Sequence, residues 1–583
     1  MSYRAPVPDI LFTLRHAAGF DRALADGLHG DLTATDVAAV LEEAGRVAND
    51  VIAPLNRAGD TSGTPIKDGV VTTAPGWKEA YAAWIAGGWN GLAAPAEWGG
   101  QDLPQAVNAA CIEMWNAASM AFGIGPVLTM AAVDALAAFG SDDLKQRYLE
   151  KLVSGVWTGT MELTEPQAGS DVGALRARAE RAADGSYRIT GQKIFITYGE
   201  HDLTDNIIHF VLARLPDAPA GTKGISLFLV PKLLLTADGR PGARNDLRAH
   251  SVEHKMGIHG SPTCTMVYGD RGGAIGWLIG REHDGMQAMF TMMNRARLAV
   301  GLQGVAIADR ATQQALAYAH DRKQGPRTII HYPDVKRMLL TMQALTAAAR
   351  TICYATGVAI DRAHRASDAA ARQAAQARAS LLTPLAKAFS TDIGIEVASL
   401  GVQVHGGMGF IEETGAAQHL RDARIAAIYE GTNGIQALDL AMRKVPLEGG
   451  VVVHTYIGEL RNTVKAVQAA NDPAFGATGA RLSEAVDSLD RATTWLLGKV
   501  NAEPKAAQAG ATPYLRLFGN TAGGCMLADE ALAALRVANG EPASRVAIAR
   551  FFAENIAVQA QGLERAVTEA SDSVNGAEAA LAG

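Results

Sequence analysis

Apolar and polar positions repeat with a helical period through the first part of the chain. Alanine-rich amphipathic runs extend from Asp36 to Ala53 and from Ala106 to Ala121, with few β-branched alternations. We therefore expect an all-helical N-terminal domain over residues 1–158. Loops between its helices are expected where proline and glycine occur, at Pro54, at Gly99-Gly100 and from Gly123 to Pro126.

The pattern changes near residue 159, where β-branched residues begin to alternate with polar ones. This alternation predicts strands in a β domain over residues 159–281. The clearest examples are Ser186–Thr197, Asn206–Ala213 and Gly224–Val230.

Helical spacing returns at Met286, Met289, Phe290 and Met293. It predicts a helical bundle over residues 282–445. Residues 446–583 are again alanine-rich and predict a further helical domain. The expected fold class is therefore mainly α with a central β domain.

Composition narrows the range of partners. A chain of 583 residues, 48% of them hydrophobic, can bury large cores in several domains. The net charge of −7 provides no basic field, so we expect no nucleic-acid partner. The N-terminus lacks the apolar core of a signal peptide, and no later stretch has the pattern of a membrane span. A cytoplasmic protein is expected.

The four cysteines are Cys111, Cys264, Cys353 and Cys525. They lie far apart and have no ligand-like spacing with histidine. We therefore expect neither a disulfide framework nor a metal site.

A single carboxylate, Glu430, stands between an apolar run and two glycines, Gly431 and Gly434. Glycines let the backbone approach a ligand closely. Apolar surroundings would raise the pKa of Glu430 towards neutrality, which suits a general base. The alternative is a helix-capping glutamate beside a turn, and the stretch alone does not exclude it.

Three other segments could contact a cofactor. The loop Met161–Asp171 clusters hydroxyls, acids and glycine, as a polar binding wall would, although a surface turn could also use Pro166 and Gly169. Arg322 and Lys323 follow a long predicted helix and could meet phosphates or complement the helix end. Gln403–Phe410 contains three glycines that permit backbone contacts, but it is not a dinucleotide-binding fingerprint.

In this order, five motifs resemble the acyl-CoA dehydrogenase family. They are Met161–Asp171 (MELTEPQAGSD), Gly191–Thr197 (GQKIFIT), Arg322-Lys323, Gln403–Phe410 (QVHGGMGF) and Ile428–Thr432 (IYEGT). The resemblance covers about residues 40–445 and implies a helical N domain, a β-barrel middle domain and a helical bundle that hold FAD and an acyl-CoA. Residues 446–583 are similar to the extension of long bacterial members, the 3-methylmercaptopropionyl-CoA dehydrogenases.

In this family a carboxylate takes the α-proton of a thioester while the β-hydrogen leaves as hydride to FAD. The resemblance implies that Glu430 is the base and that its backbone N–H stabilises the thioester oxygen. Some members carry the base on the first bundle helix, where this chain has Ala296, which cannot take a proton. Substrate contacts are implied for Ser170, Asn294, Arg297, Glu430 and Gly431.

For FAD, the resemblance implies contacts from two subunits, and hence a homodimer or a dimer of dimers. One subunit would contribute Thr164, Ser170, Phe195, Thr197 and Thr432, and the second Arg322, Gln403, Gly406 and Gly407. Two positions depart from the family pattern. Gly325-Pro326 replaces Phe-Gly, and Gly434 replaces a common glutamine.

The expected electron acceptor is electron-transfer flavoprotein. The expected substrate is 3-methylmercaptopropionyl-CoA or a fatty acyl-CoA. Two alternatives remain open, an acyl-CoA oxidase that reduces oxygen and a non-catalytic acyl-CoA-binding scaffold.

Overall fold

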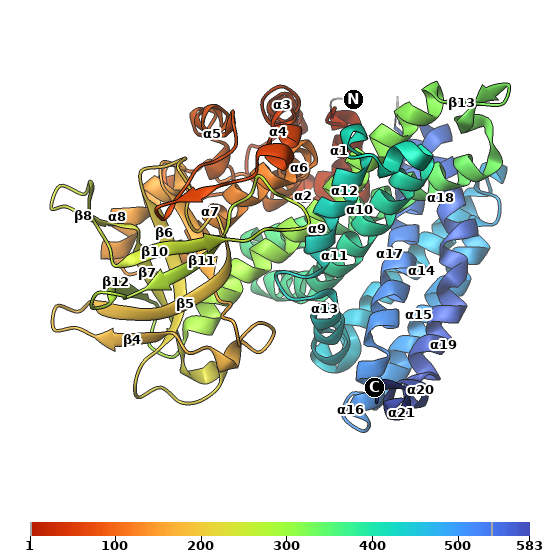
Figure 1. The fold of residues 1–583 in the computed structure, drawn as a ribbon. Helices are drawn as coiled ribbons and strands as arrows, with labels where there is room; N and C mark the ends of the chain where they lie inside the picture. The colour runs from red at the N-terminus through yellow and green to blue at the C-terminus, as the bar shows by residue number, and fades with distance from the viewer. Residues whose placement is uncertain (1–2, 538–539, 583) are drawn as a thin grey trace.

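A computed structural model describes residues 3–537 and 540–582 of the chain. Figure 1 shows a β domain on one side, the N-terminal helices across the top, long bundle helices in the centre and the C-terminal helices on the far side. The molecule is mainly α with a central β domain, as the sequence predicts.

Helices dominate the N-terminal part. Helix α3 (Ala34–Val47) begins with a capping box, in which the Thr33 hydroxyl accepts the Asp36 N–H and the Asp36 carboxylate accepts the Thr33 N–H. A short hairpin of β1 (Ile66–Lys67) and β2 (Val70–Val71) corrects the expectation of an all-helical domain. The helices are α1 (Val7–Phe12), α2 (Phe20–Ala25), α3 (Ala34–Val47), α4 (Leu55–Ser62), α5 (Trp77–Ala86), α6 (Gln105–Ala118), α7 (Met120–Phe139) and α8 (Asp142–Val153).

The loop expected from Gly123 to Pro126 is wrong, because these residues lie inside α7. The chain breaks instead at Ser119, whose extended backbone (φ −158°) separates α6 from α7. The glycines serve close packing. A Cβ on Gly123 would lie 2.8 Å from the Asn116 side chain, and one on Gly125 would lie 3.1 Å from the Tyr198 ring.

Among the described residues, α7 alone is long and apolar enough to cross a membrane. Its most apolar window is 78% buried inside the protein. The helix packs against α6, α8, α9 and the first strand of the β domain. Burial on all sides accounts for its apolar composition.

The β domain is a sheet that closes on itself. Strand β5 pairs with β12, β12 with β7, β7 with β6, β6 with β4, and β4 with β5. The three strands expected from the sequence are β5, β6 and β7. The bounds are β3 (Thr158–Glu162), β4 (Arg178–Arg181), β5 (Tyr187–Thr197), β6 (Ile207–Arg214), β7 (Ile225–Pro231), β8 (Leu233–Leu235), β9 (Pro241–Arg244), β10 (Leu247–Val252), β11 (Thr263–Tyr268) and β12 (Ala274–Ile279).

Three long helices, α9 (Gly285–Asp321), α10 (Pro333–Arg365) and α11 (Ala369–His405), pack together as the bundle (Figure 1). The approach of α9 to α11 requires glycine, because a Cβ on Gly304 would lie 2.2 Å from the Ser390 carbonyl oxygen. A hairpin of β13 (Lys323–Gln324) and β14 (Arg327–Thr328) follows α9. Two short helices, α12 (Ala416–Ala423) and α13 (Asn433–Asp439), come after α11, and Glu430 lies between them.

The C-terminal extension packs onto the bundle through α17 (Ala511–Ala534), which contacts α10, α11 and α13. Its apolar residues join those of the bundle and the N-terminal helices in one continuous core. The extension therefore supports the bundle on the side away from the β domain (Figure 1). Its other helices are α14 (Val451–Ala470), α15 (Thr478–Lys499), α16 (Pro504–Ala509), α18 (Pro542–Asn555), α19 (Ala560–Thr568), α20 (Ser571–Asn575) and α21 (Glu578–Leu581).

A substitution at Gly519 tests the contact between α17 and α11. A Cβ at this position would lie 2.2 Å from the Phe389 ring. We expect Gly519→Ala to lower the free energy of unfolding by about 1–3 kcal/mol through overpacking. The matched control is Gly498→Ala on exposed α15, where no described atom lies within 4 Å of the added Cβ. Denaturant unfolding should show the control to be neutral or slightly stabilised, and equal stability of the two variants would contradict the tight contact.

Candidate active site

Glu430 lies on a turn with an unusual backbone. After the 3₁₀ turn Arg424–Ala427, Glu430 (φ 58°) and Gly431 (φ 86°) take two successive left-handed conformations. A residue with a Cβ adopts this conformation at a cost, and such strain is concentrated at functional sites. The helix-capping interpretation of Glu430 is wrong, because Thr432 caps α13, its hydroxyl accepting the Ile435 N–H at 3.2 Å.

The Glu430 side chain is a half-buried carboxyl group whose pKa is close to neutrality. Burial raises the pKa of Glu430 to about 7, while the positive charges of Arg297 and Lys387 act in the opposite direction. Arg297 belongs to α9 and Lys387 to α11. Because a group with a pKa near the working pH gives up and takes a proton readily, this carboxyl group is suited to general base chemistry.

The same turn presents a backbone donor. Within residues 3–537 and 540–582, no protein oxygen accepts the Glu430 N–H. The Glu430 carbonyl, in contrast, has a partner, because the Gln436 side-chain amide donates to it at 3.4 Å. Glycine suits position 431 because its φ of 86° is a conformation that L side chains rarely adopt. A carboxylate and an N–H of one residue are thus both available to a ligand.

A cleft of about 820 Å³ opens beside Arg297. Arg297 donates to the Asn294 Oδ1 at 3.5 Å, while its buried Nε has no acceptor among the described residues. Ala296 is buried and offers no polar side-chain atom. The apolar lining includes Ala109, Ile112, Leu298 and Leu302, and the polar lining includes Asn294, Arg295, Arg297, Asp439 and Lys444. This mixture suits a ligand with an apolar chain and a polar remainder.

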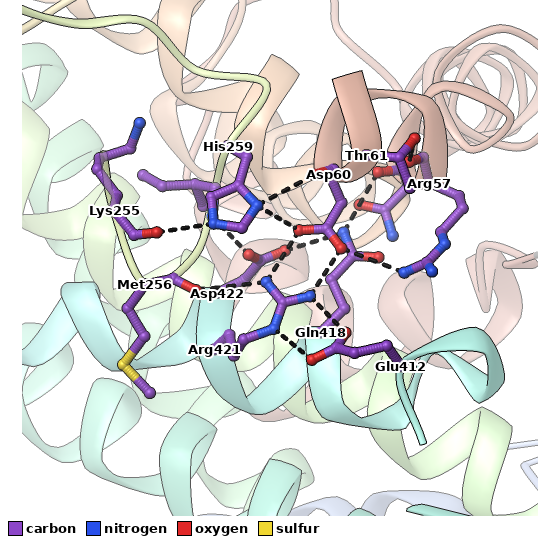
Figure 2. A network of polar contacts seen from close by, with 12 residues as sticks. Arg57, Asp60, Thr61, Lys255, Met256, His259, Glu412, Gln418, Arg421 and Asp422 are labelled. Atoms are coloured by element: carbon purple, nitrogen blue, oxygen red, sulfur yellow. Dashed lines mark hydrogen bonds and ion pairs between the residues drawn. The ribbon is translucent and has the colours of Figure 1, made fainter. Parts of the chain in front are cut away.

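An ion-pair network anchors the chain before the turn (Figure 2). Arg421 of α12 donates to both carboxylate oxygens of Asp60 of α4, at 2.9 and 2.7 Å, and to Glu412 at 2.7 Å. His259, from a loop of the β domain, contacts the same Asp60 carboxylate at 2.9 Å. The N-terminal helices, the β domain and the bundle therefore meet at one carboxylate.

Two further contacts fix the approach to Glu430. The Asp422 carboxylate accepts the Ile258 N–H at 2.5 Å, which ties α12 to the β-domain loop. Burial raises the pKa of Asp422 to about 6. The Tyr429 hydroxyl, one residue before Glu430, donates to the Gln303 side chain of α9. The position of the turn therefore depends on all three parts of the molecule.

The structure brings together the wall residues expected on the β domain. The Ile194 N–H donates to the Thr164 carbonyl at 2.9 Å, so Thr164 lies against β5, which carries Phe195 and Thr197. Ser170, later in the same loop, is exposed. Phe195 is 59% exposed and has φ 61°. Among the described residues, neither threonine hydroxyl has a protein partner. The wall combines an open apolar surface with unpaired hydroxyl groups.

A buried ion pair holds this wall in place. Lys193 of β5 donates to Glu165 at 2.8 Å and to the Leu163 carbonyl at 3.1 Å. Glu165 also accepts the backbone N–H groups of Arg176 and Ala177, at 2.6 and 3.0 Å. Although burial raises the pKa of Glu165, Lys193 and these donors hold it below its ordinary value. The residues on both sides of Thr164 are thus fixed.

The remaining expected cofactor residues lie elsewhere in the chain. Tyr318 of α9 stacks on His405 of α11 at 4.4 Å between ring centroids, which places Arg322 at the same end of the bundle as Gln403, Gly406 and Gly407. Figure 1 shows β13, next to Arg322, on the side of the molecule away from the β domain. One copy of the chain therefore does not bring this group and the Thr164 wall together.

Comparison with known families assigns each part of the chain. Residues 34–156 match the acyl-CoA dehydrogenase N-terminal domain, 160–270 the middle domain, 283–445 the C-terminal domain, and 456–578 an acetyl-CoA dehydrogenase C-terminal-like domain. A 3-methylmercaptopropionyl-CoA dehydrogenase of Ruegeria pomeroyi is 46% identical, over 98% of this chain and 99% of its own. The chain belongs to the acyl-CoA dehydrogenase family.

Solved acyl-CoA dehydrogenase structures share this fold over nearly the whole chain. ACDH-11 of Caenorhabditis elegans, solved with C11-CoA, has a TM-score of 0.78 at 20% identity and covers 94% of this chain and 91% of its own. An acyl-CoA dehydrogenase of Bacillus anthracis, solved with FAD, has a TM-score of 0.75 at 21% identity and covers 95% and 92%. The extension beyond residue 445 is thus part of the shared architecture.

Acyl-CoA dehydrogenases are oxidoreductases that use FAD, and the residues present here fit that cofactor. The exposed Phe195 and the unpaired Thr164 and Thr197 hydroxyl groups suit a flat ring with polar edges. Added Cβ atoms on Gly406 and Gly407 would meet no described atom within 4 Å, so the backbone there is open to a ligand. Among the described residues, no cluster of three potential metal ligands occurs.

Several polar and charged residues near the candidate active site were not predicted from the sequence. Lys387 and Asn433 lie beside the Glu430 turn, and Glu165 and Lys193 hold the wall. A signal for Lys387 was available, because it is a lone charge within the apolar helical run Leu381–Phe389. No comparable signal marks Asp60 or Asp422, whose partners are distant in sequence.

The network of Figure 2 can be tested with Asp60→Asn. Asp60 is 5% exposed in its side chain, and removing its charge leaves Arg421 with Glu412 as its one remaining carboxylate partner among the described residues. We expect the free energy of unfolding to fall by about 3 kcal/mol at pH 7. Burial alone would raise the pKa of Asp60, but Arg421, with the charges of His259 and Arg57, outweighs it and holds this pKa below its ordinary value. The stabilisation is therefore present above the ordinary pKa of an aspartate and is lost as the pH falls through the lower folded value.

Asp50→Asn, at an exposed position on the N-terminal helices, is the control and should leave stability unchanged. Denaturant unfolding at pH 7 and below pH 4 should show a gap between wild type and Asp60→Asn that narrows with acid. A gap that is absent at pH 7, or that stays constant with pH, would contradict this prediction.

Proposed function

We propose that this protein catalyses the FAD-dependent α,β-dehydrogenation of an acyl-CoA thioester to the trans-2-enoyl-CoA, with Glu430 as the base. The observation that carries the proposal is the turn at Glu430. There a carboxyl group with a pKa of about 7 and an N–H that no described residue accepts belong to one residue. A non-catalytic scaffold would not require this combination. Membership of the family supports the same reaction class.

Each side chain has a chemical task in this reaction. The Glu430 carboxylate removes the α-proton, and its N–H donates to the thioester oxygen, where negative charge develops. Arg297 and Asn294 hold the acyl-CoA in the cleft, with Ser170 and Gly431 against its reacting end. FAD, when bound, supplies the acceptor for the β-hydride.

The FAD site is proposed to use two copies of the chain, in a homodimer or a dimer of dimers. One copy contributes the Thr164 wall and Thr432, and the other contributes Arg322, Gln403, Gly406 and Gly407. The separation of these groups within one chain supports this arrangement (Figure 1). Exposed apolar side chains next to Gly407, namely Met408, Phe410 and Ile411, are suited to burial by a second copy.

The proposed substrate is 3-methylmercaptopropionyl-CoA or a fatty acyl-CoA. The similarity to a 3-methylmercaptopropionyl-CoA dehydrogenase over almost the full length of both chains supports the first. A panel of acyl-CoAs that differ in chain length and in the thioether, assayed with a dye acceptor, separates the two substrates by kcat/KM.

A cytoplasmic location is proposed as well, since the four cysteines, all within the described residues, are buried and free.

The base assignment predicts the behaviour of Glu430→Gln. Glutamine preserves the shape of the side chain but cannot take the α-proton, so turnover should fall by at least about 1,000-fold while FAD content and acyl-CoA binding persist. Glu42→Gln, on the exposed face of α3, should retain full activity. Near wild-type turnover of Glu430→Gln would remove Glu430 from the mechanism.

The proposed electron acceptor is electron-transfer flavoprotein, with oxidation by oxygen slow. Dehydrogenases and oxidases share the base, so the acceptor depends on how well the packed site excludes oxygen. The single helical extension resembles that of the long bacterial dehydrogenases. Turnover with electron-transfer flavoprotein should exceed peroxide formation in air at least about 100-fold. Hydrogen peroxide produced at a matching rate would favour the oxidase alternative.

A further inference from the structure

Lys387 is a buried cation that the reaction described above does not use. It lies near the middle of α11 and has no solvent exposure. Burying an ammonium group is costly unless it is paired. The other fully buried lysine, Lys193, has a carboxylate partner at 2.8 Å. Lys387, by contrast, donates to a neutral group, the Asn433 Oδ1 at 2.8 Å, and no described carboxylate oxygen lies within 4.0 Å of its Nζ.

Asn433 joins this cation to the base. It is the first residue of α13, directly after the Glu430-Gly431-Thr432 turn. Its Oδ1 accepts from Lys387 and from the Thr391 hydroxyl at 3.2 Å, and its Nδ2 donates to Asp392 at 2.6 Å and to the Ala388 carbonyl at 3.2 Å. Every polar atom of this side chain is therefore bound to α11.

We propose that Lys387 is a positioning residue for proton abstraction, which holds the Glu430 turn on α11 through Asn433 and favours the charged form of the Glu430 carboxylate. The inference rests on the proposed function, because it assumes that Glu430 is the base. This role explains why Lys387 is buried without an ion-pair partner among the described residues, since its charge acts on the Glu430 carboxylate across the turn.

The charges around Lys387 support this role. Burial lowers the pKa of Lys387 to about 7, while Glu430 and Asp392 raise it and Arg297 of α9 lowers it further. The Glu430 pKa lies in the same range, so the protonation of the two groups is coupled. Arg516 of the C-terminal α17 acts on Asp392 from the far side, while Asp439 faces Arg297. Of the two cations that favour the charged form of Glu430, Arg297 has the larger effect and Lys387 the smaller, so removing the Lys387 charge leaves Arg297 to act without it.

The test compares the pH profiles of kcat for wild type, Lys387→Met and Lys387→Arg, each with its full complement of FAD. Methionine keeps the length of the side chain but removes both the charge and the donor. We expect kcat of Lys387→Met to fall about tenfold at pH 7, with its acid limb displaced upward by about one pH unit and partial recovery at pH 9. Arginine, which restores a cation, should restore part of the rate and move the limb back.

Lys465→Met, on the exposed face of α14, is the matched control and should leave the profile unchanged. Asn433→Ala separates the two parts of the role, because it breaks the tether but keeps the charge, and it should lower kcat with less displacement of the acid limb. If Lys387→Met fails to fold or to retain FAD, Lys387→Gln, which keeps a donor, is measured for the same displacement.

A Lys387 variant whose rate falls equally at every pH would show a packing role only and would overturn the proposal, as would an unchanged profile. These outcomes are distinct from a failure of the proposed function. That failure appears as full activity in Glu430→Gln, whatever the behaviour of Lys387.

Discussion

The arrangement of this molecule depends on keeping one carboxyl group half-buried, on a strained turn, without locking it into an ion pair. Burial raises the pKa of Glu430, and two cations from different helices limit that rise. Neither cation forms a salt bridge to Glu430 among the described residues, so the carboxyl group is free to react. A close ion pair would lower the pKa further and make the group a weak base. The turn thus needs positive charges that act on Glu430 without contacting it, and rigid helices can hold such charges in place.

That requirement explains features far from the turn. Helices α9 and α11 approach closely at Gly304, and they carry Arg297 and Lys387 respectively. The C-terminal α17 packs behind α11 and is tied to it by the ion pair of Arg516 with Glu396 at 2.9 Å. On the other side of the turn, Arg421 and Asp422 bind the N-terminal and β domains. The extension and all three family domains therefore contribute to the position of one side chain.

Much of this fold could be predicted from periodicity. The strands β5, β6 and β7 follow from their alternation, and α9 follows from its apolar spacing, because burial on one face leaves a regular pattern. The prediction of a loop at Gly123 was wrong, because glycine is common both in turns and where two segments pack closely. Only the neighbours Asn116 and Tyr198, which come from folding, show that close packing is the reason here. The neighbours of Glu430 in sequence left a capping role open, and the resemblance to the acyl-CoA dehydrogenase family made it the expected base. Lys387 was not assigned, since its effect on Glu430 arises from folding rather than from adjacency.

The most direct test is the single-turnover reduction of bound FAD by a saturating acyl-CoA under nitrogen, followed by the loss of flavin absorbance between pH 5 and pH 9. The rate should rise with pH through an apparent pKa near 7, because the Glu430 carboxyl group must lose its proton before it can accept one from the substrate. A reduction rate that is constant across this range, or yellow protein that no acyl-CoA bleaches, would contradict a base held near neutrality by distant charges.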